Sequence, residues 1–201
     1  MEKSEAYYNQ IADKYQKRFT TGFLGKLRKK ERKVVYEFLN PQPGEYILDA
    51  GCGTGFDALP LMQKGCKVYG IDLSEGMVEV AKKRGVHAEV GNIEELHIDQ
   101  QFDKITSQGV MEFCTRHEQI FRNFNKHLKK NSIAVVHFPY KSISGVAYLL
   151  YHRILNSIRI KIFSPDEIMK LAAKTGFKVT GFKKAHSFIA VIKLEKVSEL
   201  S

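Results

Sequence analysis

From Tyr46 onward, short apolar runs alternate with longer stretches in which apolar residues recur every three or four positions. This alternation predicts an α/β domain with a mainly parallel sheet, because helical crossovers join parallel strands. Only about three residues separate the last two apolar runs, too few for a helical crossover, so we expect an antiparallel hairpin there. The seven predicted strands are Tyr46–Ala50, Lys67–Asp72, His87–Val90, Phe102–Gln108, Ile133–Phe138, Phe177–Lys184 and Phe188–Leu194.

Helices are expected between these strands and before Tyr46, with residues 40–44 as a hinge into the core. Glycines at 65, 85 and 176 stand where helices should end in a left-handed residue. The spacings Thr115–Glu118 and Ser164–Glu167 are typical of capping boxes that open helices. Pro165 falls at a first helical position, where its missing N–H costs nothing.

The composition is that of an ordinary globular chain. Its 201 residues are 43% hydrophobic and 27% charged, which excludes a disordered or fibrous protein. No apolar run approaches the roughly 18 residues that span a bilayer, and the N-terminus lacks the apolar region of a secretory signal. The cysteines, Cys52, Cys66 and Cys114, form no CxxC pair. We therefore expect a cytoplasmic, reduced protein without disulfides or a metal site.

Positive charge is concentrated in the C-terminal third. The formal net charge is +10, and residues 129–201 hold 13 Lys and Arg against 4 Asp and Glu. No carboxylate occurs between Glu118 and Asp166. Such a field attracts an anionic substrate, an anionic lipid surface or nucleic acid, and charge alone does not choose among them.

The strongest motif follows the first predicted strand directly. Asp49 is followed by Gly51, Gly53 and Gly55, and a helix is expected from about Asp57. Glycines suit a loop whose backbone bends sharply and approaches a ligand closely. The dinucleotide fingerprint would need a glycine where Phe56 stands, and the Gly-Lys-Ser/Thr ending of a P-loop is absent.

This D-x-G-x-G-x-G pattern resembles motif I of the class I S-adenosylmethionine-dependent methyltransferases. The resemblance implies a Rossmann-like, doubly wound seven-strand sheet, mostly parallel with a C-terminal antiparallel hairpin, and S-adenosylmethionine as the cofactor. It also implies that residues 1–40 form a helical lid and 41–201 the core, with a substrate-side insert at about 140–163.

The resemblance extends to the cofactor-binding residues. Asp72 ends the second strand, where the family's acidic residue accepts the ribose hydroxyls. Asn92 stands where the family usually has an aspartate that accepts from the adenine amino group. Tyr8 and Tyr15, seven residues apart, share one face of the lid helix. The expected cofactor contacts are Tyr8, Tyr15, Asp49, Gly51, Cys52, Gly53, Gly55, Asp72, Leu73, Met77, Asn92, Ile93 and Gln108.

The sequence carries less specific signals for the methyl acceptor than for the cofactor. Glu112, His137 and His186 are candidates for a general base, which is needed only when the nucleophile is protonated at working pH. The family's Asn/Asp-Pro-Pro-Tyr tetrapeptide, which accompanies amine methylation, is absent after the fourth strand. We therefore expect methyl transfer to oxygen or carbon of a small anionic or amphipathic molecule. The apolar and basic insert suits such a substrate or a peripheral membrane contact.

Two alternatives remain open, as does the oligomeric state. The basic run Lys26–Lys33 is compatible with an RNA methyltransferase, since phosphates reward clustered Lys and Arg. An apolar stripe of Leu24, Leu27, Val34, Val35 and Phe38 instead predicts that this run is the solvated face of a packed helix, which makes nucleic acid a weaker expectation. The other alternative is a member that binds the cofactor only to regulate a partner.

Overall fold

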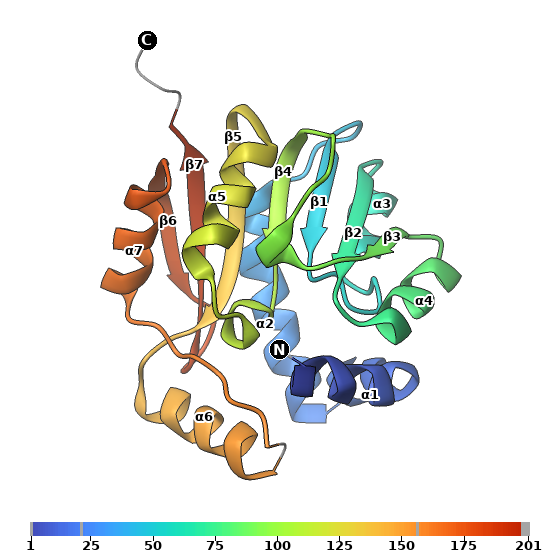
Figure 1. The fold of residues 1–201 in the computed structure, drawn as a ribbon, viewed down its shortest axis with the longest axis vertical. Helices are drawn as coiled ribbons and strands as arrows, with labels where there is room; N and C mark the ends of the chain where they lie inside the picture. The colour runs from blue at the N-terminus through green and yellow to red at the C-terminus, as the bar shows by residue number, and fades with distance from the viewer. Residues whose placement is uncertain (1, 21, 156, 198–201) are drawn as a thin grey trace.

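One seven-stranded sheet organises the molecule, as a computed structural model of residues 2–20, 22–155 and 157–197 shows (Figure 1). The strand order is β3-β2-β1-β4-β5-β7-β6. The first five strands run parallel, and β7 runs antiparallel to both of its neighbours, β5 and β6. This confirms the predicted fold class. The strands are β1 (Tyr46–Ala50), β2 (Lys67–Asp72), β3 (His87–Val90), β4 (Phe102–Ser107), β5 (Leu128–Pro139), β6 (Phe177–Lys184) and β7 (Ile189–Lys196).

Helices cover both faces of the sheet, because successive strand residues point to opposite sides. Leu48 packs in the cluster that includes Phe121 of α5, whereas Ile47 packs in the cluster that includes Val35 of α2. None of the described helices is both long and apolar enough to cross a bilayer. The helices are α1 (Glu2–Thr20), α2 (Gly22–Leu39), α3 (Ala58–Gln63), α4 (Glu75–Lys83), α5 (His117–His127), α6 (Ile143–Leu155) and α7 (Pro165–Lys174), with short 3₁₀ turns η1 (Ile93–Glu95) and η2 (Met111–Phe113).

Strand β5 is longer than the predicted strand Ile133–Phe138 because it begins at Leu128. Within this strand Asn131 takes a left-handed backbone conformation, with φ 58°, which asparagine tolerates better than most residues. The pairing register between β4 and β5 shifts between Phe102 and Lys104. The first residues of β5 therefore pair with β4 through an irregularity in the ladder.

Of the two predicted capping boxes, one forms. At the start of α7 the Ser164 hydroxyl accepts from Glu167 N at 3.2 Å, and the Glu167 carboxylate accepts from Ser164 N at 2.7 Å. The box predicted at Thr115 is wrong, because α5 begins at His117 without a side-chain cap. The Thr115 backbone N–H and hydroxyl donate instead to the buried Glu94 carboxylate. A buried carboxylate needs several donors, and here it takes those of the helix start.

The basic run in α2 has two faces. Its lysines, at 26, 29, 30 and 33, are exposed, whereas Arg28 and Arg32 turn toward the sheet edge. Val34 and Val35 are buried as predicted. The expectation for Leu24 is wrong, since 40% of it is exposed. Leu24 lies a full helical turn or more before the part of α2 that packs on the strands, so the apolar stripe extends beyond the surface that could bury it.

Replacement of Ser164 by alanine should lower the free energy of unfolding by about 1 kcal/mol, because the first turn of α7 loses its cap. Urea unfolding followed by circular dichroism measures this change. Lys170→Ala, at an exposed position of the same helix, is the matched control and should change the free energy by less than about 0.5 kcal/mol. Equal effects of the two substitutions would contradict the capping role.

Candidate functional site

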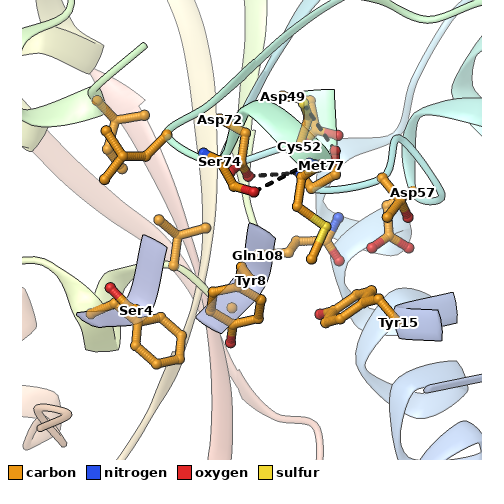
Figure 2. Close-up of a pocket in the computed structure, with 18 of the residues that line it drawn as sticks. Ser4, Tyr8, Tyr15, Asp49, Cys52, Asp57, Asp72, Ser74, Met77 and Gln108 are labelled. Carbon is orange, nitrogen blue, oxygen red and sulfur yellow. Dashed lines mark hydrogen bonds between the residues drawn. The ribbon is translucent and has the colours of Figure 1, made fainter. Parts of the chain in front are cut away.

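A pocket lies beyond the carboxyl ends of β1, β2 and β4, with α1 across it. In Figure 2, Tyr8 and Tyr15 of α1 lie on one side, opposite Asp49, Cys52 and Asp72 on the other. Ligands of open α/β sheets bind at this edge. All of the residues expected to contact the cofactor line this pocket except Gly55. A side chain at position 55 would meet Val86, so Gly55 lets the loop pack on the neighbouring elements instead.

The loop after β1 depends on glycine at two positions that face the pocket. Gly51 has φ 85°, and a Cβ there would lie 2.0 Å from Val110 Cγ2. Gly53 has φ 52°, and a Cβ there would meet no atom within 4 Å. Gly51 is therefore required by crowding as well as backbone conformation, whereas Gly53 leaves space on the pocket side for a ligand.

Asp72 ties this loop to the start of α4. Its Oδ2 accepts from Gly53 N at 2.8 Å, and its Oδ1 accepts from Ser74 N at 2.9 Å. Burial raises the pKa of Asp72, and these backbone donors oppose the shift. A carboxylate oxygen has more than one lone pair, so both oxygens retain capacity for ligand hydroxyls.

Two polar side chains in the pocket carry an atom with neither a hydrogen-bond nor an ion-pair partner among the described residues. They are Asp49 Oδ2 and Gln108 Nε2, and both atoms are buried. Burial, together with the nearby carboxylates of Asp57 and Asp72, raises the pKa of Asp49 to about 8. Unsatisfied buried polar atoms are costly, so this pair suits a ligand with both a cationic and a hydrogen-bond-accepting group. The amino-acid portion of S-adenosylmethionine has this chemistry.

Asn92 caps the start of η1, which occupies one of its side-chain atoms. Its Oδ1 accepts from Glu94 N at 2.9 Å. An aspartate at this position would keep a second oxygen for an adenine amino group, whereas asparagine offers an Nδ2 donor instead. The departure from the family pattern therefore changes the hydrogen-bonding character of this part of the pocket.

The aromatic side of the pocket is held by α1. The ring centroids of Tyr8 and Tyr15 lie 5.9 Å apart, and Tyr8 lies 5.5 Å from Phe113. Asn9 fixes the helix, because its Oδ1 accepts from the Ser74 hydroxyl at 2.6 Å and from Gly76 N at 3.0 Å. Nothing in the local sequence distinguishes Asn9 from a solvent-facing helical asparagine.

Another side of the pocket, not expected from the sequence, is formed by Arg28, Arg32, Phe56 and Asp57. Arg32 Nε lies 3.1 Å from Asp57 Oδ1, and its guanidinium stacks over the Phe56 ring at 4.5 Å. The two arginines belong to the basic run of α2, whose other members are solvated. A possible signal was their spacing of four residues, which places them together on one helix face.

The three general-base candidates lie near one another, and two of them contact Glu31, which sequence reasoning did not single out. His186 Nε2 lies 2.6 Å from Glu31 Oε1, and His137 Nε2 lies 3.2 Å from Glu31 Oε2. Arg28 donates to Glu31 Oε2 at 2.9 Å. Although burial raises the pKa of Glu31, the two histidines and Arg28 hold it well below its usual range.

The hydrogen bonds around His137 fix its tautomer. Gly109 N donates to His137 Nδ1 at 2.9 Å, so in the neutral ring the proton is on Nε2, facing Glu31. His137 Nε2 lies within ion-pair distance of Glu31 Oε2 but makes no hydrogen bond among the described residues. His186 keeps one nitrogen, Nδ1, buried without a partner among the described residues.

None of the three candidates lines the pocket, but Glu112, in η2, lies in sequence between the lining residues Val110 and Phe113. Its Oε1 accepts from the Tyr148 hydroxyl at 3.5 Å, and its buried Oε2 has no partner in the described part of the chain. Burial raises the pKa of Glu112. A raised pKa makes the carboxylate form of Glu112 a stronger base than an exposed glutamate.

Comparisons with known proteins agree with this geometry. Residues 48–136 match the family model described as a methyltransferase domain. Over 76 residues, the chain is 38% identical to malonyl-[acyl-carrier protein] O-methyltransferase from Serratia marcescens, which covers 36% of this chain and 30% of that protein. Over 96 residues, it is 35% identical to ubiquinone biosynthesis O-methyltransferase from Rickettsia conorii, covering 45% and 33% respectively. The chain thus spans about a third of the length of these curated relatives.

The whole fold also has close structural neighbours. Magnesium protoporphyrin IX methyltransferase from Synechocystis PCC 6803, solved with bound S-adenosylhomocysteine, superposes with a TM-score of 0.76 at 17% identity. The superposition covers 96% of this chain and 98% of that one. At this identity the similarity establishes the fold, and the family match adds the motif. Residues 48–136 therefore carry a methyltransferase domain, and the whole chain has the fold of the S-adenosylmethionine-dependent methyltransferases.

Proposed function

We propose that the chain transfers the methyl group of S-adenosylmethionine to an oxygen or carbon atom of a small anionic or amphipathic molecule. The observation that carries this proposal is the buried, partly unsatisfied carboxyl of Glu112 beside the pocket. An acceptor hydroxyl or acidic C–H must lose a proton during methyl transfer, so a positioned base accelerates the reaction. The names of the two curated relatives, both O-methyltransferases, support an oxygen acceptor.

Charge supports the anionic or amphipathic character of the acceptor. Arg28 and Arg32 line the pocket, each paired with a carboxylate, and the acid-free stretch 119–165 contains all of β5 and α6. The pocket wall next to Glu112 is apolar, with Val110 and Phe113. Such a site favours the binding of a molecule that has both an anionic group and an apolar surface.

Each group has a distinct task in the proposed reaction. The bound cofactor supplies an electrophilic methyl group. Asp72 would accept hydrogen bonds from the ribose hydroxyls, and Asp49 would pair with the ammonium group of the amino-acid portion. Tyr8 and Tyr15 exclude water, and Glu112 Oε2 receives the acceptor's proton. His137 and His186 act through Glu31 as positioning residues, because Glu31 holds Arg28 at the pocket edge.

Asp72→Ala should weaken binding of S-adenosylhomocysteine by about tenfold to a hundredfold, since charge-assisted hydrogen bonds are lost. Isothermal titration calorimetry measures this change. Asp72→Asn, which keeps one acceptor oxygen, should show an intermediate loss, and exposed Asp99→Ala is the control. Unchanged affinity in Asp72→Ala would remove this residue from the cofactor site.

Binding of S-adenosylhomocysteine should release a proton and strengthen as pH rises from about 6 to about 8. Asp49, with its pKa raised to about 8, is mostly protonated in the free protein at neutral pH. A cationic ligand group favours the carboxylate form of Asp49 and lowers its pKa. Affinity for the ligand therefore rises with pH until the pH exceeds the pKa of Asp49 in the free protein, and it is constant above that pH. Calorimetry in two buffers of different ionisation enthalpy counts the proton. Asp49→Asn should abolish this release, and equal release from both proteins contradicts the assignment.

Glu112→Gln should slow methyl transfer by about 10²- to 10⁴-fold while changing affinity for S-adenosylhomocysteine by less than about twofold. The assay incubates the protein with radiolabelled S-adenosylmethionine and either extracted metabolites or total RNA. Glu79→Gln, at an exposed position of α4, is the matched control. Label in metabolites that depends on Glu112 supports the proposal.

Two outcomes of the same assay would overturn it. Label in RNA alone, with binding that falls steeply as salt rises, identifies an RNA methyltransferase. Cofactor binding with no labelled acceptor in either fraction favours a regulatory member that does not transfer the methyl group.

A further inference from the structure

Helix α6 presents an apolar face to solvent. Its residues at helical spacing on this face are 95% exposed at Ile143, 47% at Val146, 45% at Leu150 and 72% at Ile154. Leu155, 68% exposed, and Tyr151 extend the same face. Single exposed apolar residues are common, but a contiguous stripe of them marks a binding surface.

The opposite face of α6 is the one that holds the helix to the protein. Gly145 and His152 are buried, and the Tyr148 ring stacks on Phe188 with centroids 5.0 Å apart. A Cβ at Gly145 would lie 2.3 Å from the Tyr140 carbonyl oxygen, so the helix approaches the end of β5 closely. The outer stripe is therefore not needed to attach α6 to the fold.

Basic residues accompany the stripe. Arg153 lies at its edge, and Arg159 and Lys161 follow α6; all three are exposed. None of the three has an ion-pair partner among the described residues, whereas Lys141, before the helix, pairs with Glu167 at 2.9 Å. With no acid between Glu118 and Asp166, nothing in this stretch offsets their charge.

This combination decides between possible occupants. A second copy of the chain would bring an identical set of cations against these, and like charges at an interface are unfavourable. The apolar stripe of α6 and the basic residues beside it fit a partner that has an apolar interior and a negatively charged surface. The interface of an anionic lipid bilayer has both properties, and helices with an apolar face and basic residues lie in it.

We propose that α6 docks the protein on anionic membranes, with Ile143, Val146, Leu150 and Ile154 entering the headgroup region and Arg153, Arg159 and Lys161 on lipid phosphates. In Figure 1, α6 and α1 lie at the same end of the sheet. The inner face of α6 touches the pocket wall, since the rings of His152 and Phe113 are 5.8 Å apart. The docked face therefore lies next to the pocket. This proposal does not depend on which acceptor is methylated.

Co-sedimentation with phosphatidylcholine vesicles, with and without one third phosphatidylserine, tests the proposal. We expect binding to the anionic vesicles and little to the neutral ones. Leu150→Ser with Ile154→Ser should reduce binding at least tenfold, because affinity scales with inserted apolar area. Arg153→Gln and Arg159→Gln should each reduce it by about fivefold. Met169→Ser and Lys170→Gln, on exposed positions of α7, are the matched controls.

Circular dichroism and S-adenosylhomocysteine affinity should be unchanged in these variants, because the substituted side chains point away from the fold and the pocket. Absence of vesicle binding by the unmodified protein overturns the proposal, as does equal loss in the α7 controls. A dimer in analytical ultracentrifugation that Leu150→Ser with Ile154→Ser dissociates, without vesicle binding, assigns the stripe to a second copy. The cofactor titrations described above succeed or fail independently of these results.

Discussion

The buried carboxylate of Glu31 is the interaction on which the acceptor side of the molecule depends. Burying a carboxylate is expensive unless charged or hydrogen-bonding partners surround it. Here the partners come from three parts of the chain: Arg28 from its own helix, His137 from the end of β5, and His186 from the turn between β6 and β7. One charge therefore fixes α2 against the C-terminal half of the sheet and holds a guanidinium at the pocket.

Three buried carboxyls illustrate how partners decide chemistry. Glu31, Asp49 and Glu112 are all nearly inaccessible to solvent. Glu31 is surrounded by cationic or hydrogen-bonding groups, and its pKa falls. Asp49 and Glu112 each keep an oxygen without a partner in the described structure, and burial raises the pKa of both. Glu31 is a carboxylate whose charge holds neighbouring elements together, whereas Asp49 and Glu112 each have an oxygen that is able to bind a ligand group or a proton.

Local patterns predicted most of the fold, and they picked out residues that line one pocket. The strand–glycine loop–helix order and the spacing to Asp72 depend on chain-local geometry, and the structure assembles those residues in one pocket. Predictions were wrong where a residue distant in sequence formed a hydrogen bond or ion pair with a group that was expected to have a local partner or to face solvent. Glu94 took the donors that would have capped α5 through Thr115, and Glu31 with Asp57 drew two arginines out of a basic run that looked uniformly solvated. Such competitions join residues far apart in sequence, and no short window contains both partners.

The placement of β7 between β5 and β6 has a consequence for how the chain acquires its structure during synthesis. β6 is made first but has no hydrogen-bonded neighbour in the sheet other than β7. Until residues 189–196 leave the ribosome, the outer edge of β5 stays unpaired and β6 has no place to attach. Unpaired edges are sites of wrong association between chains. Completion of the sheet, and with it the turn that brings His186 to Glu31, is therefore a late event that joins two strands in one step.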